Sequence, residues 1–360
     1  MSDHFILPPR QADGHKGTFG SVCVIGGQRS EDGLVMLGAP TLASNAAMRV
    51  GCGRCMLAMP RTILTQALTM SPTSTGIELP VDEVGRLMSS GSIEAIDRHA
   101  ADCRCLAIGP GFGDDWPQQQ IVASLLSRDD RPVVLDADGL NAFAKLESGH
   151  LELRAPTIMT PHVGEYARLA NALGIAAPVS NAKLAAESLA QTLGCIVVLK
   201  GAETVITDGV NTYKETRGSV VLATGGTGDV LTGIIAGLVA GYGEDATMHL
   251  MDAAVLGVRL HAMAGERFAE TRGVRPSDLD LRLAAAIWED NHLHPPEVPV
   301  HVVAVALLRE DPEVQAGCSA PGRLLPELCG TARWIPKSVG THVKTHVARP
   351  WQCKEGPEER

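Results

Sequence analysis

A loop rich in glycine and threonine leads into an apolar stretch of small residues between positions 223 and 240. The loop consists of Gly225, Gly226, Thr227 and Gly228, and Asp229 follows it. The first N–H groups of a helix lack intrahelical partners and, together with the helix dipole, bind anions. A carboxylate beside them can accept a proton from a substrate hydroxyl while the N–H groups hold a phosphoryl group. The segment therefore predicts an anion hole at 225–228 and a catalytic base at Asp229, with simple helix capping by Asp229 as the alternative.

Further clusters of glycine and polar residues each follow a short apolar, β-branched run. The clusters are Gly109–Gly113, Asp136–Asp138, Thr160–Glu165 and Lys200–Thr204. Strands are predicted at Ser21–Ile25, Arg54–Met59, Cys105–Ile108, Pro132–Leu135, Thr157–Met159 and Cys195–Leu199. Ligands of parallel sheets bind just beyond the carboxyl ends of the strands. We therefore expect the clusters to converge on one edge of a sheet.

Stretches with apolar residues at helical spacing separate these strands. Helices are predicted at 40–50, 118–126, 165–173, 181–193, 228–240 and 246–267, and an antiparallel edge at 203–207 and 212–215. This alternation is typical of an α/β fold with a mainly parallel central sheet covered by helices on both faces.

Composition narrows the class of protein. The net charge of −10 argues against nucleic acid or an anionic membrane as the main partner. The chain starts without a signal-peptide pattern, and the weakly polar run 230–243 is too short to span a membrane. Nine cysteines, an odd number, form a poor disulfide framework, so we predict reduced thiols and a cytoplasmic protein. The C-x-x-C of Cys52 and Cys55 is interpreted as two small apolar side chains.

The last part of the chain differs in pattern from the rest. Residues 292–360 are rich in proline and histidine and do not continue the alternation of strands and helices. We predict a catalytic domain at 1–291 and an appendage of unknown role at 292–360. A metal site made of Cys318, Cys329, Cys353 and nearby histidines is an alternative, although their spacing matches no known zinc pattern.

Two common nucleotide-binding motifs are absent from the sequence. It has no G-x-x-x-x-G-K-[ST], which argues against a P-loop enzyme. The Gly109–Gly113 segment is not G-x-G-x-x-G, so the dinucleotide fingerprint of Rossmann folds is missing too.

Taken together, the motifs resemble the carbohydrate-kinase-like family of NAD(P)H-hydrate dehydratases, in the order that family has them, over about residues 10–290. The matching segments are His15–Gly20, Gly38–Ala39, Gly109–Gly111, Val134–Asp138, Thr160–His162, Gly164–Glu165, Val198–Gly201, Ala223–Ile235 and Pro276–Leu279. The resemblance implies a ribokinase-like fold and the repair of hydrated NADH or NADPH. ADP would phosphorylate the C6 hydroxyl of the (6S) hydrate and leave as AMP, and loss of phosphate would then restore the nicotinamide.

The resemblance also implies roles for individual residues. The hydrated dinucleotide would contact Ala39, Gly111, His162 and Asp229. The adenine nucleotide would contact Lys200, Gly201, Ala202, Glu203, Thr204 and Gly228. Mg²⁺ would bridge phosphates, with Glu165 contacting it through water. A homo-oligomer, specifically a tetramer, is expected on the same basis.

The sequence departs mildly from the family pattern at Pro40, Gly139 and Val163, and no proposed catalytic group is lost. We expect no epimerase domain, which often precedes this family's domain, so the chain would act on the S epimer alone. Two alternatives remain open at this point. One is a small-molecule kinase of the same fold that acts on a hydroxymethylpyrimidine or a hydroxyethylthiazole. The other is a non-catalytic nucleotide-binding protein.

Overall fold

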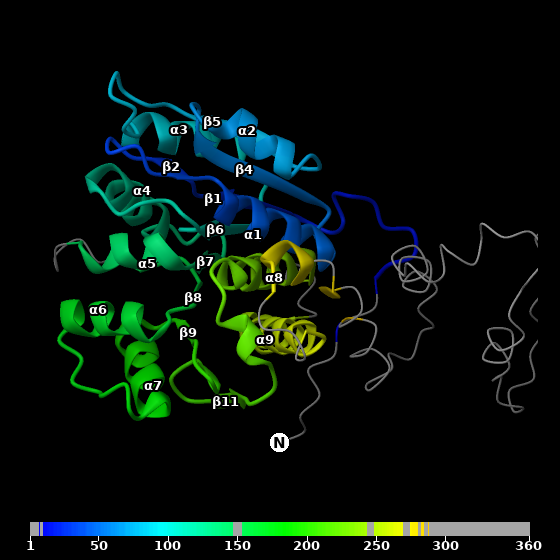
Figure 1. Ribbon diagram of the computed structural model, residues 1–360, viewed down its shortest axis with the longest axis vertical. Helices are drawn as coiled ribbons and strands as arrows, with labels where there is room; N and C mark the ends of the chain where they lie inside the picture. The colour runs from blue at the N-terminus through cyan, green and yellow to red at the C-terminus, as the bar shows by residue number, and fades with distance from the viewer. Residues whose placement is uncertain are drawn as a thin grey trace, which may run out of the picture. The chain divides into compact units, whose positions relative to one another are not determined.

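A mostly parallel sheet of nine strands forms the centre of the protein in the computed structural model (Figure 1). The structure describes residues 7, 10–146, 153–242, 248–268, 274–279, 282–283 and 287. The strand order is β11-β10-β9-β8-β7-β6-β1-β4-β5. The predicted appendage at 292–360, with its cysteines, lies outside the described residues.

Apart from β5, the strands of the sheet lie close to the positions predicted from the sequence. They are β1 (Ser21–Ile25), β4 (Arg54–Pro60), β5 (Thr75–Leu79), β6 (Cys105–Ile108), β7 (Val133–Leu135), β8 (Thr157–Met159), β9 (Ile196–Leu199), β10 (Thr204–Thr207) and β11 (Thr212–Glu215). All neighbours from β5 to β9 pair in parallel, whereas β10 pairs antiparallel with both β9 and β11. The predicted parallel sheet with an antiparallel edge is confirmed.

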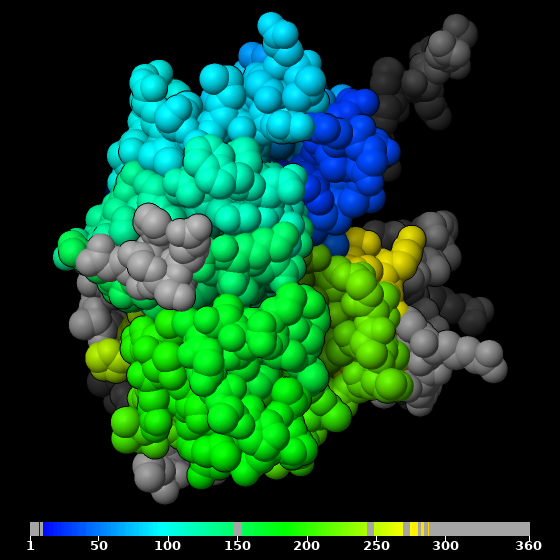
Figure 2. Space-filling view, turned by 90° about the vertical axis from the view of Figure 1, so that its left-hand side faces the viewer, coloured from blue at the N-terminus to red at the C-terminus, as the bar shows by residue number. Residues whose placement is uncertain are grey.

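Helices cover both faces of the sheet, as expected for strands that are buried on both sides. One face carries α1 (Gly38–Arg49), α2 (Leu64–Met70), α8 (Thr227–Tyr242) and α9 (Leu250–Glu266). The other carries α3 (Ser89–His99), α4 (Trp116–Leu126), α5 (Ala137–Ala144), α6 (Val163–Leu173) and α7 (Ala182–Leu193), and Figure 2 looks onto this face. Each layer has its own apolar core against the sheet.

Small residues let α8 pack closely against α1. A Cβ atom at Gly233 would lie 2.0 Å from the carbonyl oxygen of Ala43, and one at Gly237 would lie 2.7 Å from that of Ala47. Glycine at both positions therefore permits backbone contact between the two helices. This contact fixes α8, and with it the loop that precedes Asp229, relative to β1 and the rest of the sheet.

Several elements were not predicted. They are β5, α2, α3, α5 and the two-stranded hairpin of β2 (Gln28–Arg29) and β3 (Val35–Met36). The six cysteines among the described residues are free and buried, which fits the interpretation of Cys52 and Cys55 as apolar side chains. No helix in the described part of the chain is long and apolar enough to cross a membrane.

Candidate active site

The loop before α8 exposes backbone donors. The N–H groups of Gly225, Gly226, Gly228 and Asp229 have no hydrogen-bond partner among the residues that the structure describes. The N–H of Thr227 instead donates to the carbonyl of Thr224 at 3.3 Å. Free N–H groups at the start of a 16-residue helix form the arrangement that binds a phosphoryl oxygen. The predicted anion hole therefore has its donors at the glycines and at Asp229.

Thr227 holds the loop in place. Its hydroxyl donates to the carbonyls of Leu222 and Thr224 at 2.7 and 2.9 Å. Its own carbonyl lies 2.9 Å from Nε2 of His261, a buried residue of α9. Burial lowers the pKa of His261 to about 4, so the ring is neutral at neutral pH and Nε2–H can donate to this carbonyl. The side chain of His261, on the neighbouring helix α9, thus holds the loop in place.

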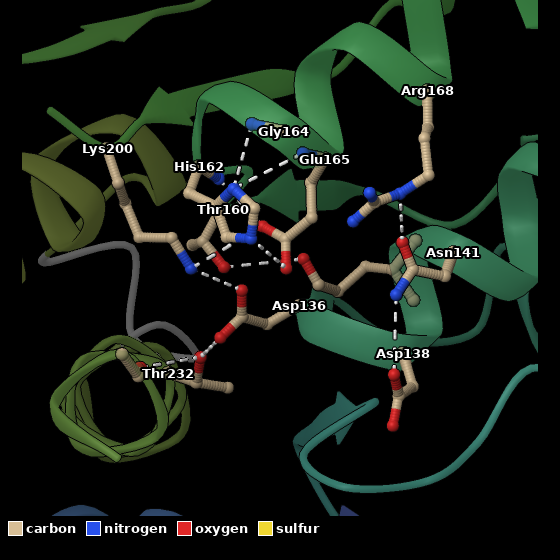
Figure 3. A network of polar contacts seen from close by, with 12 residues as sticks. Asp136, Asp138, Asn141, Thr160, His162, Gly164, Glu165, Arg168, Lys200 and Thr232 are labelled. Atoms are coloured by element: carbon tan, nitrogen blue, oxygen red, sulfur yellow. Dashed lines mark hydrogen bonds and ion pairs between the residues drawn. The ribbon is translucent and has the colours of Figure 1, made fainter. Parts of the chain in front are cut away.

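A buried carboxylate connects α8 to two strands of the sheet (Figure 3). Asp136, directly after β7, is almost fully buried. Its Oδ1 lies 2.7 Å from Nζ of Lys200, directly after β9, and its Oδ2 accepts a 2.6 Å hydrogen bond from Thr232 of α8. Both carboxylate oxygens are therefore satisfied, as a buried charge requires.

The ionised forms of this pair stabilise each other. Burial raises the pKa of Asp136, but the ammonium of Lys200 and the hydrogen bonds from Thr232 and Thr160 together outweigh burial, and the pKa is lowered. Burial lowers the pKa of Lys200, but the carboxylates of Asp136, Glu165 and Asp229 together outweigh burial, and the pKa is raised. A Cβ atom at Gly228 would lie 3.5 Å from Nζ of Lys200. A positive charge therefore lies beside the free N–H groups of the anion hole.

His162 and Glu165 form a capping box at the start of α6. The backbone N–H of His162 donates to Oε2 of Glu165 at 2.7 Å, and Nδ1 of His162 accepts from the N–H of Gly164 at 2.9 Å. The side chain of His162 is 54% exposed, whereas that of Glu165 is 6% exposed. Nζ of Lys200 lies 3.8 Å from Oε2 of Glu165, so this lysine lies between two carboxylates.

Asp229 carries the most unusual carboxyl group of the cluster. Burial, followed by the negative charge of Asp136, raises its pKa to about 7, although Lys200 opposes the shift. A base works best when its pKa is near the working pH, because it is then both ionised and able to hold a proton. The free donors, the ammonium and this carboxyl together can bind a phosphate and deprotonate a hydroxyl.

The other predicted residues are placed at the carboxyl edge of the sheet as expected. A Cβ atom at Gly111, after β6, would lie 3.4 Å from Cβ of Ala39, so these two are neighbours. His162 follows β8 and Lys200 follows β9, and the two form a parallel bridge. Gly201, Ala202 and Glu203 are exposed in the turn between β9 and β10, and Thr204, the first residue of β10, is half-buried. The structure thus brings Gly111, His162, Lys200 and Asp229 to one edge.

The donor set fits a magnesium ion that arrives with phosphates. No group of three or more His, Cys, Asp or Glu side chains able to hold a metal occurs within the described ranges. Mg²⁺ commonly binds through one or two carboxylates, waters and substrate phosphates, so this site does not need a cage of protein ligands. Oε2 of Glu165 accepts from the N–H of His162 and its Oε1 lies 3.4 Å from Nε2 of His162, so a contact of Glu165 with the ion would be made through water.

Comparison with known proteins shows to which family the chain belongs. A family model described as NAD(P)H-hydrate dehydratase matches residues 22–288. This chain belongs to the NAD(P)H-hydrate dehydratase family. A relative named ADP-dependent (S)-NAD(P)H-hydrate dehydratase, from Neisseria meningitidis serogroup B, is 32% identical over 80% of this chain and 90% of its own.

Other relatives carry names of the same family. A bifunctional NAD(P)H-hydrate repair enzyme from Moorella thermoacetica is 38% identical over 75% of this chain and 49% of its own length. The chain therefore spans about half the length of the bifunctional relatives. The solved ADP/ATP-dependent NAD(P)H-hydrate dehydratase from Bacillus subtilis superposes with a TM-score of 0.63 at 29% identity, covering 79% of this chain and 94% of that one. The ribokinase-like fold expected for the family is confirmed.

Sequence reasoning missed three residues of the cluster. Asp136 was noted as a strand end without a role, and neither Thr232 nor His261 was singled out. The signal for Asp136 was the polar D-A-D segment directly after a buried strand, where ligands collect. Ala137, within that segment, has a φ of 48°, which is uncommon for a residue other than glycine.

Proposed function

We propose that this family member dehydrates the (6S) hydrate of NADH or NADPH, with ADP as the phosphoryl donor. The observation that carries the proposal is Asp229, a carboxyl with a pKa of about 7 in the first turn of α8, beside free N–H groups and Lys200. A kinase of the same fold needs the same base, but the family assignment favours dehydration.

The proposed reaction has two steps, a phosphoryl transfer and an elimination. Asp229 accepts the proton of the C6 hydroxyl as that oxygen attacks the β-phosphorus of ADP, the bond to the α-phosphate oxygen breaks, and AMP leaves. The C6–O bond of the phosphate ester then breaks, and the departing phosphate takes up the proton lost from C5 as the C5–C6 double bond forms. The N–H groups of Gly225, Gly226 and Gly228 would stabilise charge on the transferred phosphoryl oxygens.

The nucleotide would lie over the segment from Lys200 to Thr204 and Gly228. Lys200, held by Asp136, would contact phosphate with the N–H bonds not directed at carboxylates. A magnesium ion bound to the phosphates would neutralise their charge, with Glu165 contacting it through water. The Bacillus subtilis relative was co-crystallised with ATP and Mg²⁺, which supports a metal–nucleotide complex as the form that binds.

The hydrated dinucleotide would lie on the opposite side of Asp229, against Ala39, Gly111 and His162. The half-exposed ring of His162 is anchored through Nδ1, so its Nε2 is the atom directed at substrate or at Glu165. The glycine at 111, with a φ of 58°, lets the substrate approach the backbone closely.

The direct test is turnover of the purified chain. Hydrated NADH and hydrated NADPH would each be incubated with ADP or with ATP, and the regenerated dihydronicotinamide followed by its absorbance. We expect turnover that depends on both nucleotide and Mg²⁺, with AMP formed from ADP. Phosphorylation of a hydroxymethylpyrimidine or hydroxyethylthiazole with no dehydration would contradict the proposal.

Location and assembly are proposals as well. The buried, unpaired cysteines of the described part fit a reducing cytoplasm. A homo-oligomer, specifically a tetramer, is proposed from the family resemblance, and light scattering of the purified chain tests it.

A further inference from the structure

The segment after β7 directs two carboxylates to different partners. Asp136 faces the catalytic cluster at the ends of β7, β8 and β9, whereas Oδ2 of Asp138 accepts a 2.9 Å hydrogen bond from the N–H of Gly113. Ala137, between them, has a φ of 48°, and within the described ranges it is the one residue other than glycine with a positive φ. A left-handed conformation is unfavourable for alanine and persists only where the surroundings hold it. Asp138 therefore has a partner of its own, in the loop after β6.

The loop after β6 is fixed by hydrogen bonds at its two ends. It contains three glycines, Gly109, Gly111 and Gly113, and each has a positive φ. The N–H of Gly109 donates at 3.0 Å to the carbonyl of Ile25 on β1, and the N–H of Gly113 donates to Asp138. The N–H of Gly111, midway, donates to none of the residues that the structure describes. The two end bonds thus hold the loop and leave its middle donor for a ligand.

Asp138 is itself held by side chains of two helices (Figure 3). Its Oδ1 accepts a 3.3 Å hydrogen bond from Nδ2 of Asn141, and Oδ1 of Asn141 accepts a 2.8 Å bond from Nε of Arg168. Asp138 and Asn141 lie on α5, and Arg168 lies on α6, which begins directly after His162. The chain of bonds therefore connects the loop after β6 to α6. Both segments carry proposed substrate contacts, Gly111 and His162.

The charge of Asp138 also acts on the catalytic base. Burial, followed by the charge of Asp136, raises the pKa of Asp229, and the charge of Asp138 adds to this shift against the ammonium of Lys200. Each oxygen of the Asp138 carboxylate accepts one of the hydrogen bonds just described. A carboxylate engaged in this way is suited to holding its neighbours close to the base.

A purely structural role of Asp138 is the alternative. Asp138 lies in the first turn of α5, where a negative charge interacts favourably with the helix dipole. That role depends on the charge and does not involve the N–H of Gly113. Holding the loop, in contrast, depends on an oxygen acceptor at this position, whether or not it is charged. The two roles therefore predict different results for a substitution by asparagine.

We infer that Asp138 is a positioning residue for the hydrated dinucleotide, and that it acts by holding the loop whose free N–H, that of Gly111, binds the substrate. Asn141 and Arg168 hold Asp138 in turn and fix the spacing between this loop and His162. The inference rests on the proposed function and adds a residue to it. Because the adenine nucleotide is proposed to lie over the turn after β9, loss of the bond to the loop should weaken binding of the hydrated dinucleotide alone.

The test compares two Asp138 variants at pH 8.5, where the carboxyl of Asp229 is ionised. Asp138→Ala removes the acceptor, so KM for hydrated NADH should rise about fivefold or more, which corresponds to the loss of about one net hydrogen bond. The kcat and the KM for ADP should not change, as expected when only uniform binding of one substrate is lost. Asp138→Asn keeps an oxygen that can accept from Gly113, so it should restore most of the affinity.

Asp114→Asn is the matched control. It breaks the largely exposed ion pair between Asp114, the residue after Gly113, and Lys145 near the end of α5. An exposed pair contributes little, so no kinetic constant should change. Equal KM values for wild type and Asp138→Ala would overturn the inference. Equal rises in Asp138→Ala and Asp138→Asn, together with an equal loss of stability in urea, would show that only the charge on α5 matters and would also overturn it.

A double-mutant cycle tests the role of Asn141. Asn141→Leu alone should raise KM for hydrated NADH by less than Asp138→Ala does, because Asp138 keeps its bond to the loop. Adding Asn141→Leu to Asp138→Ala should cause no further rise, since the two residues act through one chain of bonds. Effects that multiply in the double variant would show that Asn141 acts independently, and the proposed chain would be wrong.

The inference can fail independently of the proposed function. If wild type does not dehydrate hydrated NADH, the proposed function fails, and NADH is then titrated by calorimetry into wild type and Asp138→Ala with the nucleotide site saturated by ADP. Weaker NADH binding in Asp138→Ala, with equal ADP affinity in the two proteins, supports the positioning role even then. Equal NADH binding rejects it.

Discussion

The ammonium of Lys200 lies 2.7 Å from the buried carboxylate of Asp136, across the two strand ends of β7 and β9. Because β8 lies between these strands, the ion pair spans the sheet edge on which the catalytic cluster lies. The same carboxylate accepts a hydrogen bond from Thr232, one turn after Asp229. The pair therefore fixes both the charge beside the anion hole and the position of the helix that carries the base.

Asp136→Asn tests this relationship. The change removes one partner of a largely buried pair, so we expect a loss of about 1–3 kcal/mol in the free energy of unfolding, less than for a fully buried pair because Lys200 can reach water. It also removes a negative charge that raises the pKa of Asp229, so the acid limb of the kcat/KM profile should move to lower pH. Asp129→Asn, on the surface, is the control and should alter neither. An unmoved acid limb would show that Asp136 does not act on the base.

The pH dependence of the wild type follows from Asp229. Its pKa of about 7 means that the carboxyl gains a proton as pH falls through neutrality, and a protonated base is inactive. We expect kcat/KM to fall about tenfold per pH unit below that value and to level off above it. Initial rates with hydrated NADH between pH 5.5 and 9 measure this dependence. A kcat/KM that stays unchanged as the pH falls through 6 would contradict Asp229 as the titrating base.

His261→Leu should destabilise the loop that precedes α8. The change leaves the carbonyl of Thr227 without its partner, at a cost of about 1–3 kcal/mol at pH 7.5. The pKa of His261 is depressed in the folded state to about 4, from 6.5. As the pH falls, His261 therefore takes up a proton in the unfolded wild type before it does so in the folded one. The contribution of His261 to the free energy of unfolding is lost as the pH falls from 6.5 toward 4. Urea unfolding should show the wild-type advantage shrinking over this window, and a pH-independent difference would contradict the account.

The sequence predicted most of the sheet because its strands are buried on both faces and appear as short apolar runs. It missed β5, whose residues Thr75–Leu79 include glycine and glutamate, and α3, whose start is rich in serine and glycine. Local propensity was weak in both, and packing against the sheet decides their structure.

The site was predictable to a lesser extent. Asp229 and the loop before it are contiguous in sequence, so their chemistry can be read directly. The partners of Asp136 lie 64 and 96 residues further along the chain, at Lys200 and Thr232. Pairing of this kind depends on strand order and on how α8 crosses the sheet, and neither is visible in periodicity. His261 lies in an apolar helix, where the sequence does not distinguish a loop-fixing histidine from any other.

A truncation after Asn291 tests the predicted boundary. Every residue proposed for binding or catalysis lies before position 276, so the shortened chain should fold and keep its turnover. Thermal unfolding and the NADH-regeneration assay on both lengths measure this. A folded truncation without activity would show that 292–360 complete the site or an interface between copies.

The central claim is that Asp229 deprotonates the substrate hydroxyl, and Asp229→Asn tests it most directly. The amide keeps the size of the side chain and can still cap α8, but it cannot accept the proton. Turnover of hydrated NADH with ADP should fall by about 10²–10⁴-fold, while the affinity for ADP, measured by calorimetry on the same protein, stays within a few-fold of wild type. Wild-type turnover in this variant, or a loss of turnover that merely follows a loss of stability, would contradict the account.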